Sequence, residues 1–131
     1  LSPYGGYVAA IRDSLGDDSL VNYRPLEWIM LSPPWHKGRV VMIGDAVHAT
    51  TPHMASGAGM AVEDGLVLAD ELARHDEVAE ALAAFTARRF ERARMVVENS
   101  VRIGEIEIAG GDQRDANAML GDTMHKLHQP Y

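Results

Sequence analysis

Apolar and small side chains recur with helical spacing along the second half of the chain. Over residues 77–108 they follow steps built from three and four positions, at Leu82, Phe85, Ala93, Val96, Ser100, Gly104 and Ile108. This spacing puts them on one face of a long helix, which the glycine pair 110–111 ends. A shorter helix is predicted over residues 59–74, with Ser56 as its N-cap. Residues 112–131 are polar and weakly patterned, so at most a short helix is predicted there.

The first half carries two short apolar runs that predict β-strands. They are residues 26–31 (LEWIML) and residues 40–43 (VVMI), and the second run has no polar alternation, which is typical of a strand covered on both faces. A short helix is predicted over residues 7–15, ended by Gly16. Two strands do not form a stable open sheet alone. We therefore predict an α/β chain with an incomplete sheet, completed by another chain or by the rest of a larger protein.

Composition is that of a globular protein and excludes several classes. At 131 residues the chain fits one domain, and no apolar run reaches the ~18 residues of a membrane span. It has no cysteine, so a disulfide framework is excluded. Its first residues are not expected to be a signal peptide, and a cytoplasmic location is expected. A formal charge of −7 argues against a nucleic-acid partner. The start at Leu1 rather than at Met is interpreted as a sign of a longer protein.

Arginines on the predicted long helix are a local exception to this acidic character. They are Arg88, Arg89, Arg92, Arg94 and Arg102. Because Glu91, Glu98 and Glu105 are interleaved with them, we interpret the set as a solvated face of the helix.

The sharpest chemical signal follows the second predicted strand, which stops at Gly44 and Asp45. In open α/β sheets, ligands bind beyond the carboxyl ends of strands. Gly44 lets a ligand approach the backbone, and the Asp45 carboxylate can accept hydrogen bonds from ligand hydroxyls. The simpler alternative is an ordinary turn in which Asp45 bonds its own backbone.

A second signal is the glycine-rich start of the helix at Gly57, Ala58 and Gly59. The backbone amides of a helix start lie at the positive end of the helix dipole and favour negative charge. Val62 stands where a dinucleotide fingerprint needs glycine, so this is not that fingerprint. The start suits any partial negative charge, including the edge of a flavin ring. The alternative is a glycine-rich helix start that binds nothing.

Other chemistries find less support in the loop between these signals. Asp45, His48 and His53 could ligate a metal, but they do not form a helical i,i+4 pair and Pro52 interrupts them, so a structural role is favoured for the histidines. Pro52 offers a rigid contact surface or simply stiffens the loop. No Gly-x-Ser-x-Gly sequence occurs, which argues against a hydrolase.

Residues 38–72, taken together, resemble a known family motif. They read GRVVMIGDAVHATTPHMASGAGMAVEDGLVLADEL. This is similar to the second flavin motif of the FAD-dependent aromatic hydroxylases, which are single-component flavoprotein monooxygenases with a p-hydroxybenzoate-hydroxylase-like fold. The salicylate-hydroxylase-like branch resembles it most. Residues 81–105 resemble the long helix that follows this motif, and residues 22–39 resemble the last substrate-domain strand that precedes it.

The resemblance implies a fold and a division into domains. The fold would be the C-terminal part of that α/β FAD-binding fold, with two short strands followed by a helix and a long C-terminal helix. Residues 1–35 would end the substrate-binding domain, residues 36–109 would form the C-terminal half of the FAD-binding domain, and residues 110–131 would be a polar tail. The family's N-terminal Gly-x-Gly-x-x-Gly is missing, so the chain resembles the C-terminal third of such an enzyme.

The resemblance also implies site residues, none of them catalytic and none a metal ligand. The cofactor-binding residues would be Gly44, Asp45, Pro52, Gly57, Ala58 and Gly59. The carboxylate would bind the ribitol of FAD, the proline would pack beside flavin and substrate, and the amides would stabilise negative charge on the pyrimidine edge of the flavin. The chain departs from the family loop at three positions, because Ala55 and Ser56 replace Gly-Gln and Gly59 replaces Asn.

The implied reaction is NAD(P)H- and O₂-dependent hydroxylation of an aromatic or similar ring through a flavin C4a-hydroperoxide. The expected partners are FAD, NAD(P)H as co-substrate, O₂, a small aromatic substrate, and either a second copy of the chain or the N-terminal part. We expect the chain alone to be inactive. The alternative is a non-enzymatic, truncated relative whose Arg/Glu-rich helix mediates dimerisation.

Overall fold

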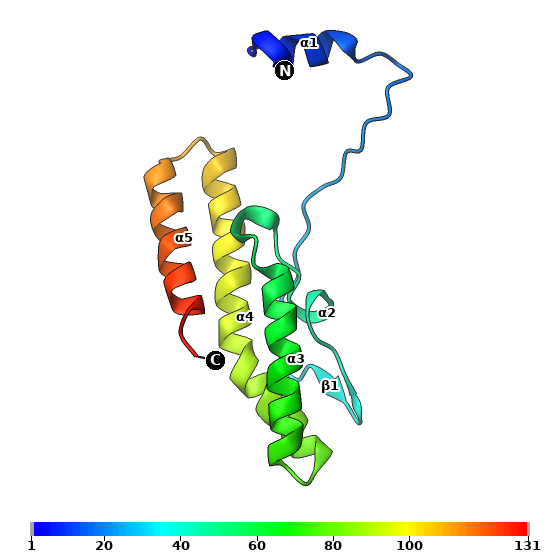
Figure 1. Ribbon diagram of the computed structural model, residues 1–131, viewed down its shortest axis with the longest axis vertical. Helices are drawn as coiled ribbons and strands as arrows, with labels where there is room; N and C mark the ends of the chain where they lie inside the picture. The colour runs from blue at the N-terminus through cyan, green and yellow to red at the C-terminus, as the bar shows by residue number, and fades with distance from the viewer. Residues whose placement is uncertain (1, 131) are drawn as a thin grey trace.

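The structure, a computed structural model, describes residues 2–130 and is mostly helical (Figure 1). Its elements are, in chain order, α1 (Gly6–Ser14), β1 (His36–Lys37), β2 (Val40–Val41), α2 (Asp45–His48), the 3-10 helix η1 (Pro52–Met54), α3 (Gly57–Arg74), α4 (Val78–Ile108) and α5 (Gln113–Leu127). The two strands form an antiparallel sheet in which His36 pairs with Val41 and Lys37 with Val40. Within residues 2–130, no helix combines the length and apolar character that crossing a membrane requires.

Two apolar clusters hold the helical body together around α4. The larger joins the connector before β1 to α2, α3 and α4, through Trp35, Val47, Met60, Val67, Phe85, Ala93 and Val96. The smaller joins η1, the end of α4 and α5, through Met54, Ile103 and Ala116. In Figure 1, α3 and α5 run beside α4, while α1 lies apart from this body and buries none of its residues. The helix α4 is therefore the support to which the loop between β2 and α3 is attached.

The predicted fold class is confirmed. Two short strands precede a helix and a long helix, and the sheet is incomplete. The predicted long helix over residues 77–108 matches α4, and the predicted short helix over residues 7–15 matches α1 within one residue.

The prediction of a strand over residues 26–31 is wrong. The segment is extended, and the backbone N–H groups of Ile29 and Leu31 donate to the carbonyls of Ala49 and Val47, at 2.9 Å each. Those acceptors belong to α2 and the residue after it. A helical turn cannot offer the regular row of partners that a strand needs, so the segment stays an extended connector.

The predicted strand over residues 40–43 forms only at its first two positions, as β2. Its expected burial on both faces is wrong, because Val40 is 71% exposed while Val41 packs against the larger cluster. The face of β2 that carries Val40 therefore has no covering layer in the described chain.

The C-terminal segment is more ordered than its polar composition predicted. The helix α5 has 15 residues and begins after Asp112, whose side chain accepts the N–H of Arg114 at 2.9 Å and so caps the helix. Ala116, Leu120 and Met124 recur every fourth residue and pack toward α4 in the smaller cluster. This sparse spacing is the feature of the sequence that indicates the helix.

Candidate functional site

The residues singled out in the sequence lie on the loop that joins β2 to α3. Gly44 is buried and Gly57 is half-buried, and the other four are exposed: Asp45, Pro52, Ala58 and Gly59. Asp45 begins α2, Pro52 begins η1 and Gly57 begins α3. The loop is therefore an open surface supported by helices.

Asp45 faces the first residue of α3 across this loop. A Cβ built on Gly57 would lie 4.0 Å from Oδ1 of Asp45 and 3.4 Å from Cγ2 of Thr50. The missing side chain at Gly57 therefore keeps space open between the carboxylate and the start of the helix. The hydroxyl of Thr50 is buried and has no hydrogen-bond partner in the described part of the chain.

The turn before Asp45 requires glycine at position 44 for two reasons. Gly44 has φ +58°, in the left-handed region that side chains disfavour. A Cβ on Gly44 would also approach the Cβ of Ala61 on α3 to 3.0 Å. The backbone here lies directly against α3, which fixes where Asp45 emerges.

The first turn of α3 presents backbone N–H groups that have no backbone acceptor in the part of the chain that the structure describes. Ser56 occupies the predicted N-cap position, but its hydroxyl donates to the carbonyl of Met54 at 2.8 Å and forms no cap bond. Within residues 2–130, the N–H groups of Gly57, Ala58 and Gly59 make no backbone hydrogen bond. A helix start of this kind can donate to a partial negative charge.

Hydrogen bonds to α4 hold the segment that carries Pro52. The hydroxyl of Ser100 donates to the carbonyl of Thr51 at 2.7 Å, and Nδ1 of His53 lies 2.9 Å from the Thr51 hydroxyl. The ring of His53 rests on Gly104, where a Cβ would come within 2.6 Å of Cε1. The helix α4 thus sets the position of η1.

His48 and Asp64 form a buried pair behind the loop. Nε2 of His48 lies 2.6 Å from Oδ2 of Asp64, and the same oxygen accepts the N–H of Gly44 at 2.8 Å. Nε of Arg89 donates to the other oxygen at 2.7 Å. Burial raises the pKa of Asp64, but hydrogen bonds from His48, Gly44 and Arg89 outweigh burial and lower the pKa below its ordinary 3.8.

This pair supports the structural interpretation of His48. Its ring nitrogen faces a carboxylate inside the protein, while Asp45 is exposed. In the part of the chain that the structure describes, no group of three or more His, Asp or Glu side chains is arranged to hold a metal. His53 is likewise turned toward Thr51 and α4.

The interpretation of the arginines as a solvated face is wrong for Arg88, Arg89 and Arg92. Arg89 is fully buried, and Arg92 is nearly so. Both donate to Glu63 on α3, Arg92 through two nitrogens at 2.8 Å each and Arg89 through Nη1 at 2.8 Å. Arg88 pairs with Glu71, which also lies on α3. The carboxylates of α3 face α4 and draw these guanidinium groups inward, whereas two arginines do lie exposed, Arg94 and Arg102.

Acid is expected to weaken the contact between α3 and α4. Burial raises the pKa of Glu63, but hydrogen bonds from Arg92 and Arg89 lower it below its ordinary 4.5, and the pKa of Asp64 is lowered too. Stability from a lowered carboxylate pKa is complete above the unfolded value, near pH 4, and is lost as pH falls through the folded value. Urea denaturation should therefore give a constant free energy of unfolding down to about pH 5 and a fall below about pH 4. A free energy that stays constant to about pH 2 would contradict this.

Three further residues shape the loop but were not assigned to the site from the sequence: Thr50, Ala55 and Asp64. Ala55 has φ +49°, a left-handed conformation that costs a non-glycine residue about 1–2 kcal/mol. The family loop that the sequence resembles has glycine at this position, which was the available signal. For Asp64 the signal was its place between Met60 and Val67 on the buried face of α3, where an unpaired charge would be costly.

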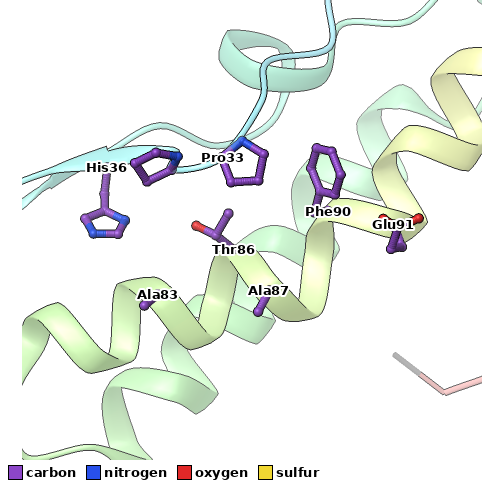
Figure 2. A pocket seen from close by; sticks show the side chains of 8 residues that line it. Pro33, His36, Ala83, Thr86, Ala87, Phe90 and Glu91 are labelled. Atoms are coloured by element: carbon purple, nitrogen blue, oxygen red, sulfur yellow. The ribbon is translucent and has the colours of Figure 1, made fainter.

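A separate groove lies on the side of α4 that faces the connector before β1. Figure 2 shows Pro33 and His36 on one side of it and Thr86 and Phe90 on the other. Its volume is about 450 Å³, and Nδ1 of His36 is buried without a hydrogen-bond partner among the described residues. None of the six cofactor-binding residues predicted from the sequence lines this groove, so it does not belong to the loop site.

Comparison with known proteins gives a family and several relatives. Residues 26–100 match the family model described as FAD binding domain. A Bacillus subtilis (strain 168) protein named as an FAD-dependent monooxygenase is 40% identical over 111 residues, covering 85% of this chain and 30% of the relative. Aurachin C monooxygenase/isomerase of Stigmatella aurantiaca is 49% identical over 72 residues, which are 55% of this chain and 19% of the relative.

A third relative is 6-hydroxynicotinate 3-monooxygenase of Pseudomonas fluorescens. It is 44% identical over 77 residues, which are 53% of this chain and 20% of the relative. The chain thus spans between a fifth and a third of the length of these relatives. The matched family region contains the whole loop from β2 to α3.

Proposed function

Because this chain belongs to the FAD binding domain family, we propose that it is the FAD-holding part of an NAD(P)H- and O₂-dependent monooxygenase. The substrate would be an aromatic or similarly activated ring, and the enzyme would act in the cytoplasm. Three relatives named as monooxygenases support the reaction class. The observation that carries the site assignment is the exposed Asp45 carboxylate beside the open start of α3.

The loop offers FAD complementary groups at two ends. Asp45 supplies acceptors that suit the hydroxyls of the ribityl chain. Ala58 and Gly59 supply N–H donors that suit the oxygen and nitrogen atoms of the pyrimidine edge. Gly57 lies between the Asp45 carboxylate and these donors, and its missing side chain lets a flat ring approach the backbone. The residues present therefore fit the cofactor.

When bound, FAD would supply the redox chemistry and the activation of O₂. The chain's own residues would bind and orient it. The amides at the start of α3 would stabilise negative charge on the pyrimidine edge, since they are already aimed and need no rearrangement. Pro52, held by η1 on α4, would present a rigid apolar surface beside the ring. None of these residues transfers a proton in this proposal.

The alternative, a module that dimerises through its Arg/Glu-rich helix, finds less support. Arg89 and Arg92 are engaged by Glu63 inside the same chain. Arg94 and Arg102 lie close to Glu91 and Glu105 of their own helix. The charges of α4 therefore have partners without a second copy.

Replacing Asp45 with Ala in the full-length gene product tests the proposal. The variant loses the charged acceptor for the ribityl hydroxyls, and a hydrogen bond to a charged group contributes about 1.5–3 kcal/mol. The dissociation constant for FAD, measured by fluorescence titration, should rise about 10- to 100-fold.

The matched control for this test is Asp76→Ala. Asp76 is also an exposed aspartate, but it lies in the connection between α3 and α4, away from the loop. Its replacement should leave FAD affinity unchanged. Equal FAD affinity in the wild type and in Asp45→Ala would reject the assignment of this loop as the ribityl site.

A further inference from the structure

One carboxylate of α3 connects the two halves of the loop site. Asp64 is fully buried, and its Oδ2 accepts the N–H of Gly44 at 2.8 Å and lies 2.6 Å from Nε2 of His48. Its Oδ1 accepts Nε of Arg89 at 2.7 Å. Asp64 therefore holds the turn after β2, the short helix α2 and the long helix α4 at once.

The bond to Gly44 acts on the residue directly before Asp45. The carbonyl of Gly44 is also fixed, because it accepts the N–H groups of Val47 and His48 at 3.0 Å each. With both its N–H and its carbonyl bonded, and with φ at +58°, this residue has little freedom to rotate. The direction in which Asp45 leaves the backbone follows from that of Gly44.

The same helix also carries the other half of the site. Gly57, Ala58 and Gly59 form the first turn of α3, and Asp64 lies two turns further on. A rigid helix thus sets the position of the N–H donors directly, and the position of the Asp45 carboxylate through Asp64. The spacing between donors and acceptor is then a property of one element.

We infer that Asp64 is a positioning residue for the flavin site, which acts on the ribityl end of FAD through the N–H of Gly44 and the placement of Asp45. This inference rests on the proposed function. Asp64 touches no ligand in this role. Its effect on flavin binding passes through Asp45 alone, so it should disappear when Asp45 is removed.

Asp64→Asn is the variant that tests this role. The two oxygens of Asp64 accept N–H groups from opposite sides, whereas asparagine has a single oxygen. The side-chain NH₂ of asparagine would face either the N–H of Gly44 or Nε of Arg89. Both of those groups are donors, so one of the two hydrogen bonds would be lost. Should this variant fail to fold, Asp64→Glu takes its place, because it keeps the charge beside Arg89 but moves the oxygens by one methylene.

The chain offers a closely matched control in Glu71→Gln. Glu71 is also a buried carboxylate of α3, seven positions after Asp64, and it also pairs with an arginine of α4, Arg88. It does not bond the turn at Gly44. A general weakening of the α3–α4 contact would appear in both variants. An effect that passes through the turn at Gly44 would appear only in Asp64→Asn.

The first measurement is amide hydrogen exchange in the full-length gene product without FAD. The N–H of Gly44 should exchange slowly in the wild type and in Glu71→Gln, and about tenfold faster or more in Asp64→Asn. Unchanged exchange at Gly44 in Asp64→Asn would overturn the inference. This readout is independent of flavin.

The second measurement is FAD affinity in a double-mutant cycle. Asp64→Asn should raise the dissociation constant about tenfold on its own, and less than about threefold when Asp45 is already Ala. An equal rise in both backgrounds would overturn the inference, because Asp64 would then act without Asp45. If Asp45→Ala weakens FAD binding and Asp64→Asn does not, the inference fails while the proposed function stands. If Asp45→Ala has no effect, the proposed function fails and the inference falls with it.

Discussion

Replacing Arg89 with Met is expected to lower the free energy of unfolding by about 3–5 kcal/mol. Arg89 is fully buried and donates to Asp64 and Glu63, at 2.7 and 2.8 Å. Methionine keeps much of the apolar stem but removes the charge, so two carboxylates lose a donor inside the protein. Removing one partner of a buried ion pair is costly because the remaining charge has left water without full compensation.

Urea denaturation of the wild type and the variant measures this loss. The matched control is Arg102→Met, on the exposed part of α4, where the pairing with Glu105 contributes at most about 1 kcal/mol. Combining Arg89→Met with Asp64→Asn should cost less than the sum of the two single variants, since the double variant buries one charge fewer. A loss below about 1 kcal/mol in Arg89→Met would mean that water or movement of α4 compensates the carboxylates.

Arg89 also shows why the sequence alone predicted the helix but not its role. The apolar stripe of α4 passes through Phe85 and Ala93, and Arg89 lies four residues from each, so its position already indicated the buried face. Its charge, with neighbouring glutamates on α4, favoured a solvent-exposed position for Arg89 instead. The deciding groups, Glu63 and Asp64, lie on another helix, and periodicity within one helix carries no information about them.

The loop site was predictable to the extent that it is local in sequence. Gly44, Asp45 and Gly57 could be identified because each residue type has a specific backbone or hydrogen-bonding capacity at a strand end or a helix start. The bond from Gly44 to Asp64 spans 20 positions and depends on how α3 lies against the turn. That packing is set by the tertiary fold, so local sequence patterns could not identify the role of Asp64.

The two errors in strand prediction have a common physical origin. Residues 26–31 have the composition of a strand, but in this chain their backbone meets α2 rather than another strand. Residues 40–43 have the composition of a covered strand, but β2 has a partner on one edge only. Strand propensity describes a fit to a neighbouring pleated surface, so it fails where the described chain supplies no such neighbour.

The family resemblance is confirmed by the matched FAD binding domain and by the relatives named as monooxygenases. The salicylate-hydroxylase-like branch, the division at residues 35 and 109, and the six cofactor-binding residues stay predictions. The assignment of the six residues depends on contacts with FAD, and the loop offers groups of the right chemistry for those contacts at Asp45 and at the start of α3.

Replacing Trp35 with Ala is expected to lower the free energy of unfolding by about 3–5 kcal/mol, by leaving a cavity in the larger cluster. Trp35 is fully buried, and its ring centre lies 6.1 Å from that of Phe85 and 5.7 Å from that of His48. Its Nε1 also donates to the carbonyl of Leu31 at 2.9 Å. The side chain thus joins α4 to α2 and to the connector before β1, so its loss should loosen the support beneath Asp45.

Trp28→Ala is the matched control, because Trp28 is the chain's second tryptophan and is 53% exposed on the extended connector. Its loss should change the free energy of unfolding by about 0.5 kcal/mol. Urea denaturation followed by circular dichroism compares the two variants, and each retains one tryptophan as a fluorescent reporter. Similar small losses in both variants would show that the larger cluster collapses around the missing ring. The backbone bonds from Ile29 and Leu31, together with the bonds from Asp64 to Gly44 and His48, would then hold α2 without the ring of Trp35.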